Sequence, residues 1–200
     1  MGATIAGRAS PEWSWLVSAG IGRSSALESM GSNNVVGALR TTPNPEKDKS
    51  HSLLGRLVYT PSAVQKHVFT LENVDKRADY DLLSARTATV TDSRAQTTMK
   101  RWRASWQGEW RELNTTLADE IKLMASYQSS DSREFLTETR TPPLAYRERD
   151  VTYDEDALQL HAQAGKTLRW SNGLSGKFSY GMDYLRGKVV NEQNGITPPA

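Results

Sequence analysis

Apolar and polar residues alternate with a period of two in seven segments of the chain. Such alternation places successive side chains on opposite faces of a β-strand. The segment 99–110 shows it most clearly, with Trp102, Ala104, Trp106 and Trp110 on one parity and Arg101, Arg103, Ser105, Gln107 and Glu109 on the other. The pattern predicts strands near 13–21, 53–60, 66–74, 99–110, 117–128, 157–164 and 174–184.

Two of these segments also fit the spacing of a helix. The helical stripes would be Leu117, Ile121 and Met124 in one segment and Ala157, Leu160 and Ala164 in the other. Short apolar patterns often permit both interpretations. The neighbouring segments are rich in aromatic residues and alternate without ambiguity, which favours strands throughout.

The connections between the predicted strands differ in length. Those at 61–65, 111–116 and 165–173 are short, whereas those at 22–52, 75–98 and 129–156 are long and polar. Transmembrane β-barrels have short periplasmic turns and longer extracellular loops. We therefore expect short and long connections to alternate strictly, and the long ones to be solvated and mobile. The charged stretch 41–50, punctuated by Pro43 and Pro45, reads as a loop tip.

The distribution of aromatic residues favours lipid over a soluble core. The aromatic residues lie near the ends of the apolar faces: Trp13, Tyr59, Trp106 and Trp110 toward the short connections, and Trp102, Tyr127 and Tyr184 toward the long ones. Aromatic rings form girdles at both membrane interfaces of such barrels. The predicted fold class is thus all-β, an antiparallel up-and-down transmembrane β-barrel fragment with about seven strands of a larger barrel. A soluble β-sandwich remains the alternative, because its half-buried strands also alternate.

Composition narrows the class of protein further. No apolar run approaches the roughly 20 residues of a membrane-spanning helix, and the hydrophobic content is only 37%. The net charge of +2 comes from interspersed acidic and basic residues, so no nucleic-acid partner is expected. The absence of cysteine excludes thiol catalysis, disulfide bonds and cysteine-based zinc sites.

Four stretches of sequence resemble the barrel strands of TonB-dependent outer-membrane receptors. They are Leu54–Ser62 (LGRLVYTPS), Phe69–Glu72 (FTLE), Asp81–Arg86 (DLLSAR) and Lys177–Tyr184 (KFSYGMDY). The last is similar to the Tyr-Gly-x-Asp strand of the haem/haemoglobin receptor branch. The resemblance covers roughly residues 13–190, and its motifs are more specific for the superfamily than for the haem branch.

This resemblance implies a 22-stranded barrel with a plugged lumen, located in the bacterial outer membrane. It also implies active transport of haem or another iron carrier, energised by TonB through regions outside these residues. Both ends of the sequence look cut, so 1–200 is expected to be a partial barrel domain without its plug domain. The TonB box and the Phe-Arg-Ala-Pro and Asn-Pro-Asn-Leu boxes of the family are absent. The implied partners are outer-membrane lipid, the TonB system and an extracellular haem or iron-carrier ligand.

Three histidines are the candidate haem or metal ligands. His51 precedes the second predicted strand at the long-loop end, where its imidazole could be an axial haem ligand, although an ordinary loop histidine is the simpler interpretation. His161 shares the polar face of its strand, which predicts that it lines the lumen. His67 shares the parity of Phe69 near a short turn, which predicts an interfacial position. Haem is expected only as a transported ligand, not as a resident cofactor.

No catalytic residue and no metal site are predicted. The acidic residues Asp150, Asp154, Glu155 and Asp156 offer oxygen ligands for Ca²⁺ but lack the glycine and spacing of an EF-hand, so a solvated loop is expected there. The sequence contains no phosphate-binding glycine loop and no triad motif, so the protein is predicted not to be an enzyme. The alternative functions are a soluble carbohydrate-binding β-sandwich module and an outer-membrane barrel adhesin or enzyme.

Overall fold

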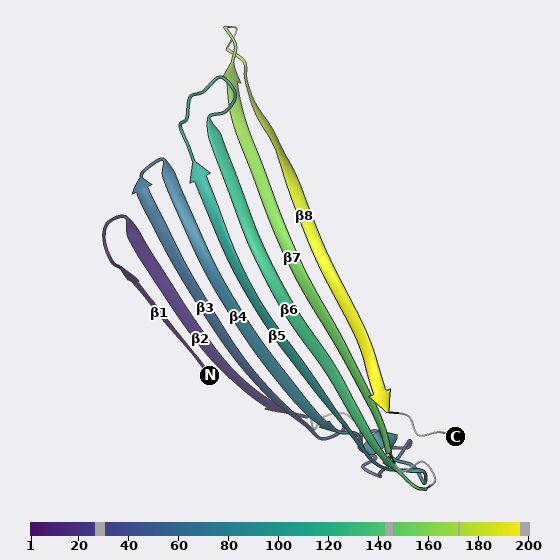
Figure 1. Ribbon diagram of the computed structural model, residues 1–200. Coiled ribbons are helices and arrows are strands. Elements are labelled where there is room, and N and C mark those ends of the chain that lie inside the picture. Colours follow the sequence, from purple (N-terminus) through teal and green to yellow (C-terminus); the bar gives the residue numbers. More distant parts are fainter. Residues whose placement is uncertain (27–30, 143–145, 172, 197–200) are drawn as a thin grey trace.

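A computed structural model describes residues 1–26, 31–142, 146–171 and 173–196. Eight antiparallel strands form one sheet in chain order, and each strand pairs with the next along the sequence (Figure 1). The strands are β1 (Gly2–Arg8), β2 (Trp13–Ser25), β3 (Glu46–Ser62), β4 (Gln65–Asp81), β5 (Val90–Trp110), β6 (Glu120–Arg140), β7 (Tyr146–Arg169) and β8 (Ser175–Ile196). The 3₁₀-helix η1 (Leu83–Ala85) is the single helical element among the described residues. The predicted fold class, an all-β up-and-down sheet whose edges stay open, is confirmed.

The strands are longer than the sequence pattern predicts, and there is one more of them. β1 precedes the first predicted strand and pairs with β2 from Gly2↔Gly20 to Arg8↔Ser14. β6 and β7 stay in register from Glu120↔Gly165 to Thr139↔Tyr146. The segments predicted to be helical or extended, 117–128 and 157–164, lie mainly within these two strands. The helical alternative is therefore wrong for the residues that β6 and β7 contain.

Two of the three predicted long connections, 75–98 and 129–156, are largely strand, and strands also extend into both ends of 22–52. β2 ends at Ser25 and β3 begins at Glu46, while β4 ends at Asp81 and β5 begins at Val90. β6 ends at Arg140 and β7 begins at Tyr146. The connection from β5 to β6, predicted to be short, spans residues 111–119 and is longer than the one at 82–89. The predicted strict alternation of short and long connections is thus wrong, although the two sets do gather at opposite ends of the sheet (Figure 1).

The sheet has almost no buried core. In the described part of the chain, only Val68, Ala78, Val90 and Ala118 are buried apolar residues. The accessible surface is 13900 Å², whereas a compact monomer of this mass exposes about 9,400 Å². Both faces of the sheet are therefore bare, and large apolar side chains such as Phe178 and Met182 are more than half exposed.

Candidate functional site

One face of the sheet carries a continuous band of apolar side chains, which we call the apolar belt. It consists of Ala3, Ile5 and Gly7 on β1; Trp13, Trp15, Val17, Ala19 and Ile21 on β2; Leu53, Gly55, Leu57 and Tyr59 on β3; His67, Phe69 and Leu71 on β4; Trp102, Ala104, Trp106, Gly108 and Trp110 on β5; Ile121, Leu123, Ala125 and Tyr127 on β6; Leu158, Leu160, Ala162 and Ala164 on β7; and Phe178, Tyr180, Met182 and Tyr184 on β8. The belt contains no Asp, Glu, Lys or Arg. Its widest parts run nine residues along β2 and β5, or about 27 Å at 3.4 Å per residue.

The belt runs obliquely across the strands. At the end of the sheet where the connections 26–45 and 82–89 lie, the belt ends on β2 at Ile21. The residues that pair in turn with Ile21 on the following strands form a row that reaches Val190 on β8. On β8 the same boundary lies at Tyr184, six residues nearer the short connections. A shift of about one residue per strand, at about 3.4 Å per residue and 4.8 Å between strands, corresponds to an angle of about 35°. At the other end of the belt, the row that starts at Trp13 on β2 reaches Met182 on β8, whereas the belt on β8 ends at Phe178. This shift of four residues over six strands corresponds to an angle of about 25°.

A row of stacked rings borders the belt toward the short connections. The centroids of Trp13 and Tyr59 are 4.3 Å apart, and His67 stacks between Tyr59 and Trp106 at 6.0 Å from each. Trp110 meets the His67 ring edge-on at 5.3 Å. The indole Nε1 of Trp106 donates to Nδ1 of His67 over 3.3 Å. His67 shares the face of Phe69 at this end of the sheet, as its parity predicts, and its interfacial position stays a prediction.

Tyrosine hydroxyls at the two boundaries point out of the belt. Tyr127, whose ring lies 5.2 Å from that of Trp102, donates to the carboxylate of Asp156 over 2.8 Å. Tyr180, at the other boundary, donates to the carbonyl of Leu117 over 2.7 Å. Each ring is therefore apolar on the belt side and hydrogen-bonded on the outer side, as amphipathic rings at a polar–apolar boundary are.

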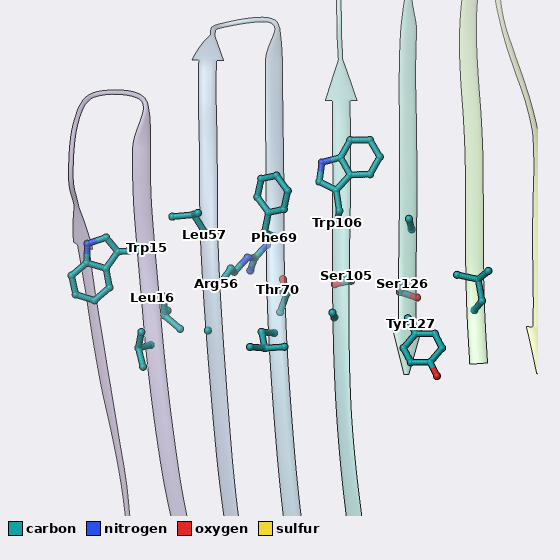
Figure 2. Close-up of a pocket in the computed structure, with 16 residues that line it drawn as sticks. Trp15, Leu16, Arg56, Leu57, Phe69, Thr70, Ser105, Trp106, Ser126 and Tyr127 are labelled. Atoms are coloured by element: carbon teal, nitrogen blue, oxygen red, sulfur yellow. The ribbon is translucent and has the colours of Figure 1, made fainter. Parts of the chain in front are cut away.

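Small side chains leave a hollow in the middle of the belt. Gly55, Ala104 and Ala125 lie among larger side chains, and the hollow has a volume of about 720 Å³. Figure 2 shows the rings of Trp15, Phe69, Trp106 and Tyr127 on the strands that surround it. A Cβ atom at Gly55 would meet no atom within 4 Å. The hollow is open on the face of the sheet, so flexible apolar groups can fill it.

The opposite face is mostly polar and charged at the same level, and Leu16, Leu54, Val58 and Val68 also lie on it. Four basic side chains project from it, each between two belt residues of its own strand: Arg56, Arg103, Lys122 and His161. Nδ1 of His161 lies 2.6 Å from a carboxylate oxygen of Asp183. The position predicted for His161 on the polar face is thus correct. Among the described residues, no hydroxyl group bonds to this pair.

The connections at the far end of the sheet fold against each other. The side-chain amide of Asn44 donates to Oγ of Ser84 over 2.9 Å, and the backbone N–H of Ser84 donates back to Oδ1 of Asn44 over 3.0 Å. Arg86 donates to both Asp81 and Asp92, at 2.5 and 2.6 Å. Sequence patterns did not identify the contact between Asn44 and Ser84, because these two residues are 40 positions apart. The predicted loop tip at 41–50 lies partly in β3, which begins at Glu46.

Arg86→Ala should loosen the connection between β4 and β5. Two carboxylates, Asp81 and Asp92, would then face each other without the guanidinium between them, which should lower local stability by roughly 1–2 kcal/mol after screening by solvent. Amide hydrogen exchange of residues 82–89 measures the effect. Arg94→Ala is the matched control, because Arg94 also pairs with Asp92 but is 68% exposed. Equal exchange in the two variants would show that Arg86 does not hold the connection.

The structure places His51 inside β3 rather than before it. Its side chain shares the face of the belt, opposite Ile21 and Asp75, and is exposed. It does not face the polar side of the sheet, so the geometry adds no support for a haem ligand. The role remains a prediction.

The acidic residues predicted to form a solvated loop lie in β7 instead. Asp150 accepts two hydrogen bonds from the guanidinium of Arg133, at 2.7 and 2.6 Å, which hold the pKa of Asp150 below its usual range. Asp156 accepts the hydrogen bond of Tyr127, while Glu155 has the opposite strand parity. Within the described ranges, no three acidic or histidine side chains converge on a metal position. Nor does any described helix have the length and apolar character of a membrane span.

No protein-family model matches this chain, and neither does any curated protein sequence.

Proposed function

We propose that this chain forms part of the wall of a bacterial outer-membrane β-barrel, an active-transport receptor for haem or another iron carrier that is energised through TonB. The observation that carries the membrane assignment is the oblique, charge-free apolar belt. Measured along an axis tilted by about 30° from the strands, its widest parts are about 24 Å high. The lipid-facing band of transmembrane barrels is about 25 Å high, with strands tilted by about 35–45°.

The two boundaries of the belt support the same assignment. Rings stack along one boundary, and tyrosine hydroxyls turn outward at both, as in the aromatic girdles of barrels. The charged opposite face suits a water-filled lumen. The open edges indicate that β1 and β8 need further strands, since unpaired backbone groups are not tolerated in hydrocarbon. β1 has only seven residues and β8 has 22, so the two edges do not match each other as partners.

The assignment to an iron-carrier receptor has different support. It rests on the resemblance of Leu54–Ser62, Asp81–Arg86 and Lys177–Tyr184 to TonB-dependent receptors. In the proposed orientation the connections at 26–45 and 82–89 are extracellular, because the longest connection, 26–45, lies at that end and barrels of this class have their longer loops outside the cell. These connections would meet the ligand first. A soluble β-sandwich would need a second packed sheet, and the described residues form only one.

Growth on haem as the sole iron source tests the proposal. The full-length protein, expressed in a bacterium without its own haem receptors, should support growth that is lost when the gene for TonB is deleted. Growth that does not depend on TonB, in cells whose outer membrane contains the protein, would contradict active transport and favour an adhesin.

A loop replacement locates the recognition end. The backbone N–H of Thr41 donates to the carbonyl of Asn33 over 2.9 Å, so residues 34–40 can be replaced by a short glycine linker without moving β2 or β3. The control shortens residues 114–118, since Leu113 and Asp119 are joined in the same way at 2.9 Å. The first variant should lose uptake and still insert, while the second should keep both. The reverse result would overturn the proposed orientation.

A further inference from the structure

Three basic residues lie side by side across the face that carries the apolar belt. Arg23 on β2 is directly opposite Lys49 on β3, and Lys49 is directly opposite Arg77 on β4. Lys47 lies on the same face, two residues before Lys49 on β3 and farther from the belt. We call these four residues the basic cluster. All four side chains are exposed.

The cluster has few anionic neighbours. Arg77 pairs with Asp79 at 3.0 Å, whereas Arg23, Lys47 and Lys49 have no ion-pair partner in the part of the chain that the structure describes. Asp79 also lies directly opposite Lys47, and Asp75, in the next row toward the belt, lies opposite His51 and Lys100. Like charges directly opposite each other destabilise a sheet, so the arrangement favours an anionic partner supplied from outside the chain.

The position of the cluster relative to the belt indicates the kind of partner. Arg23 follows the boundary residue Ile21 by two positions, about 7 Å along the strand, and Lys49 lies four positions beyond Leu53, about 14 Å. The headgroup layers bring a bilayer from about 30 Å to about 40–45 Å. Long basic side chains also reach back toward such an interface. Arg77 lies six positions beyond Leu71, about 20 Å along β4. Arg23 is therefore at the level of the headgroups, and Lys49 and Arg77 lie progressively above it, on the face that carries the belt.

We propose that the basic cluster binds the phosphate groups of a phosphorylated lipid headgroup in the outer leaflet, an inference that rests on the proposed membrane function. The guanidinium group of Arg23 binds phosphate oxygens with paired N–H donors, Lys49 beside it acts as a point charge, and Arg77, which pairs with Asp79, adds its remaining N–H groups. The lipid's acyl chains lie against the belt below. A soluble anion would lack this second contact, so the site selects phosphate that is attached to a lipid.

The test uses the full-length protein with Arg23→Gln and Lys49→Gln combined. The matched control combines Lys66→Gln and Lys76→Gln, two exposed lysines of β4 whose parity places them on the opposite face. Each protein is reconstituted into phosphatidylcholine vesicles with or without a bisphosphorylated glycolipid, and glycolipid binding is measured by titration. Since one cation near a membrane surface contributes about fivefold in affinity, the cluster variant should bind roughly 30-fold more weakly. The control should bind like the wild type.

Further measurements distinguish lipid-bound phosphate from free phosphate, and the headgroup site from the membrane function. A dephosphorylated glycolipid should bind the wild type as weakly as the intact lipid binds the cluster variant. Equal binding by the cluster variant and the wild type, or inorganic phosphate that binds as tightly as the lipid, would overturn the proposal. Protease protection of the reconstituted strands is recorded in every sample. Failure of the wild type to insert would overturn the membrane function itself, whereas insertion without dependence on the cluster would overturn only the headgroup site.

Discussion

Leu160→Arg should lower the free energy of unfolding of the membrane-inserted protein by about 2–4 kcal/mol, the cost of a cation near the middle of a barrel's lipid face. Leu160 lies in the middle of the belt on β7, opposite Ala125 and Tyr184, and is 41% exposed in the structure. In lipid, that exposed surface would contact hydrocarbon. Urea unfolding from vesicles, followed by tryptophan fluorescence, measures the change.

The neighbouring residue provides the control for this experiment. Gln159 is adjacent in sequence and exposed, but it faces the polar side, opposite Ser126 and Leu185. Gln159→Arg adds the same charge to the same strand and should change the free energy of unfolding by less than about 0.5 kcal/mol. Similar losses from the two substitutions would show that the two faces are not in different solvents.

Removing detergent should convert the isolated 200-residue chain from a monomer into aggregates. The belt exposes a contiguous apolar surface far larger than the few hundred Å² usual for soluble monomers. The edges of β1 and β8 also present unpaired backbone groups that template further pairing. Sedimentation velocity with and without detergent measures the change.

Detergent addition is the internal control for that prediction, since it covers the belt without altering the sequence. The sample should return to a smaller species when detergent is present from the start of refolding. A single monomeric boundary in plain buffer would contradict both the exposed belt and the open edges.

The sequence predicts the part of the fold where one face is apolar. Within the belt, parity alone identifies the face of Trp102, Trp106 and Phe178, and the structure agrees. Beyond the belt both faces are polar, as in β6 from Ser129 to Arg140, so the period-two signal disappears although the strand continues. That is why the long connections were predicted to be much longer than they are. β1 was missed because Gly2–Arg8 has small residues and only one large apolar side chain, Ile5.

The site can be predicted only in part, because the sequence does not reveal how neighbouring strands are aligned. Alternation assigns a residue to a face but not to a row, because a row depends on how neighbouring strands are aligned. The stack of Tyr59, His67 and Trp106 and the row of Arg23, Lys49 and Arg77 both emerge only once that alignment is known. The contact between Asn44 and Ser84 likewise joins residues that no local pattern connects.

The length of β6 beyond the belt has an electrostatic consequence. From Tyr127 to Arg140 the strand continues for 13 residues, about 44 Å along its path and about 35–40 Å above the belt at the inferred tilt. At physiological ionic strength the potential of a charged surface decays over about 8 Å. In the proposed orientation, the connection that holds Arg86 between Asp81 and Asp92 is several such lengths away from the lipid phosphates. An approaching ligand would therefore experience the field of the protein's own charges there, and the charge of the membrane would not repel an anionic carrier such as haem.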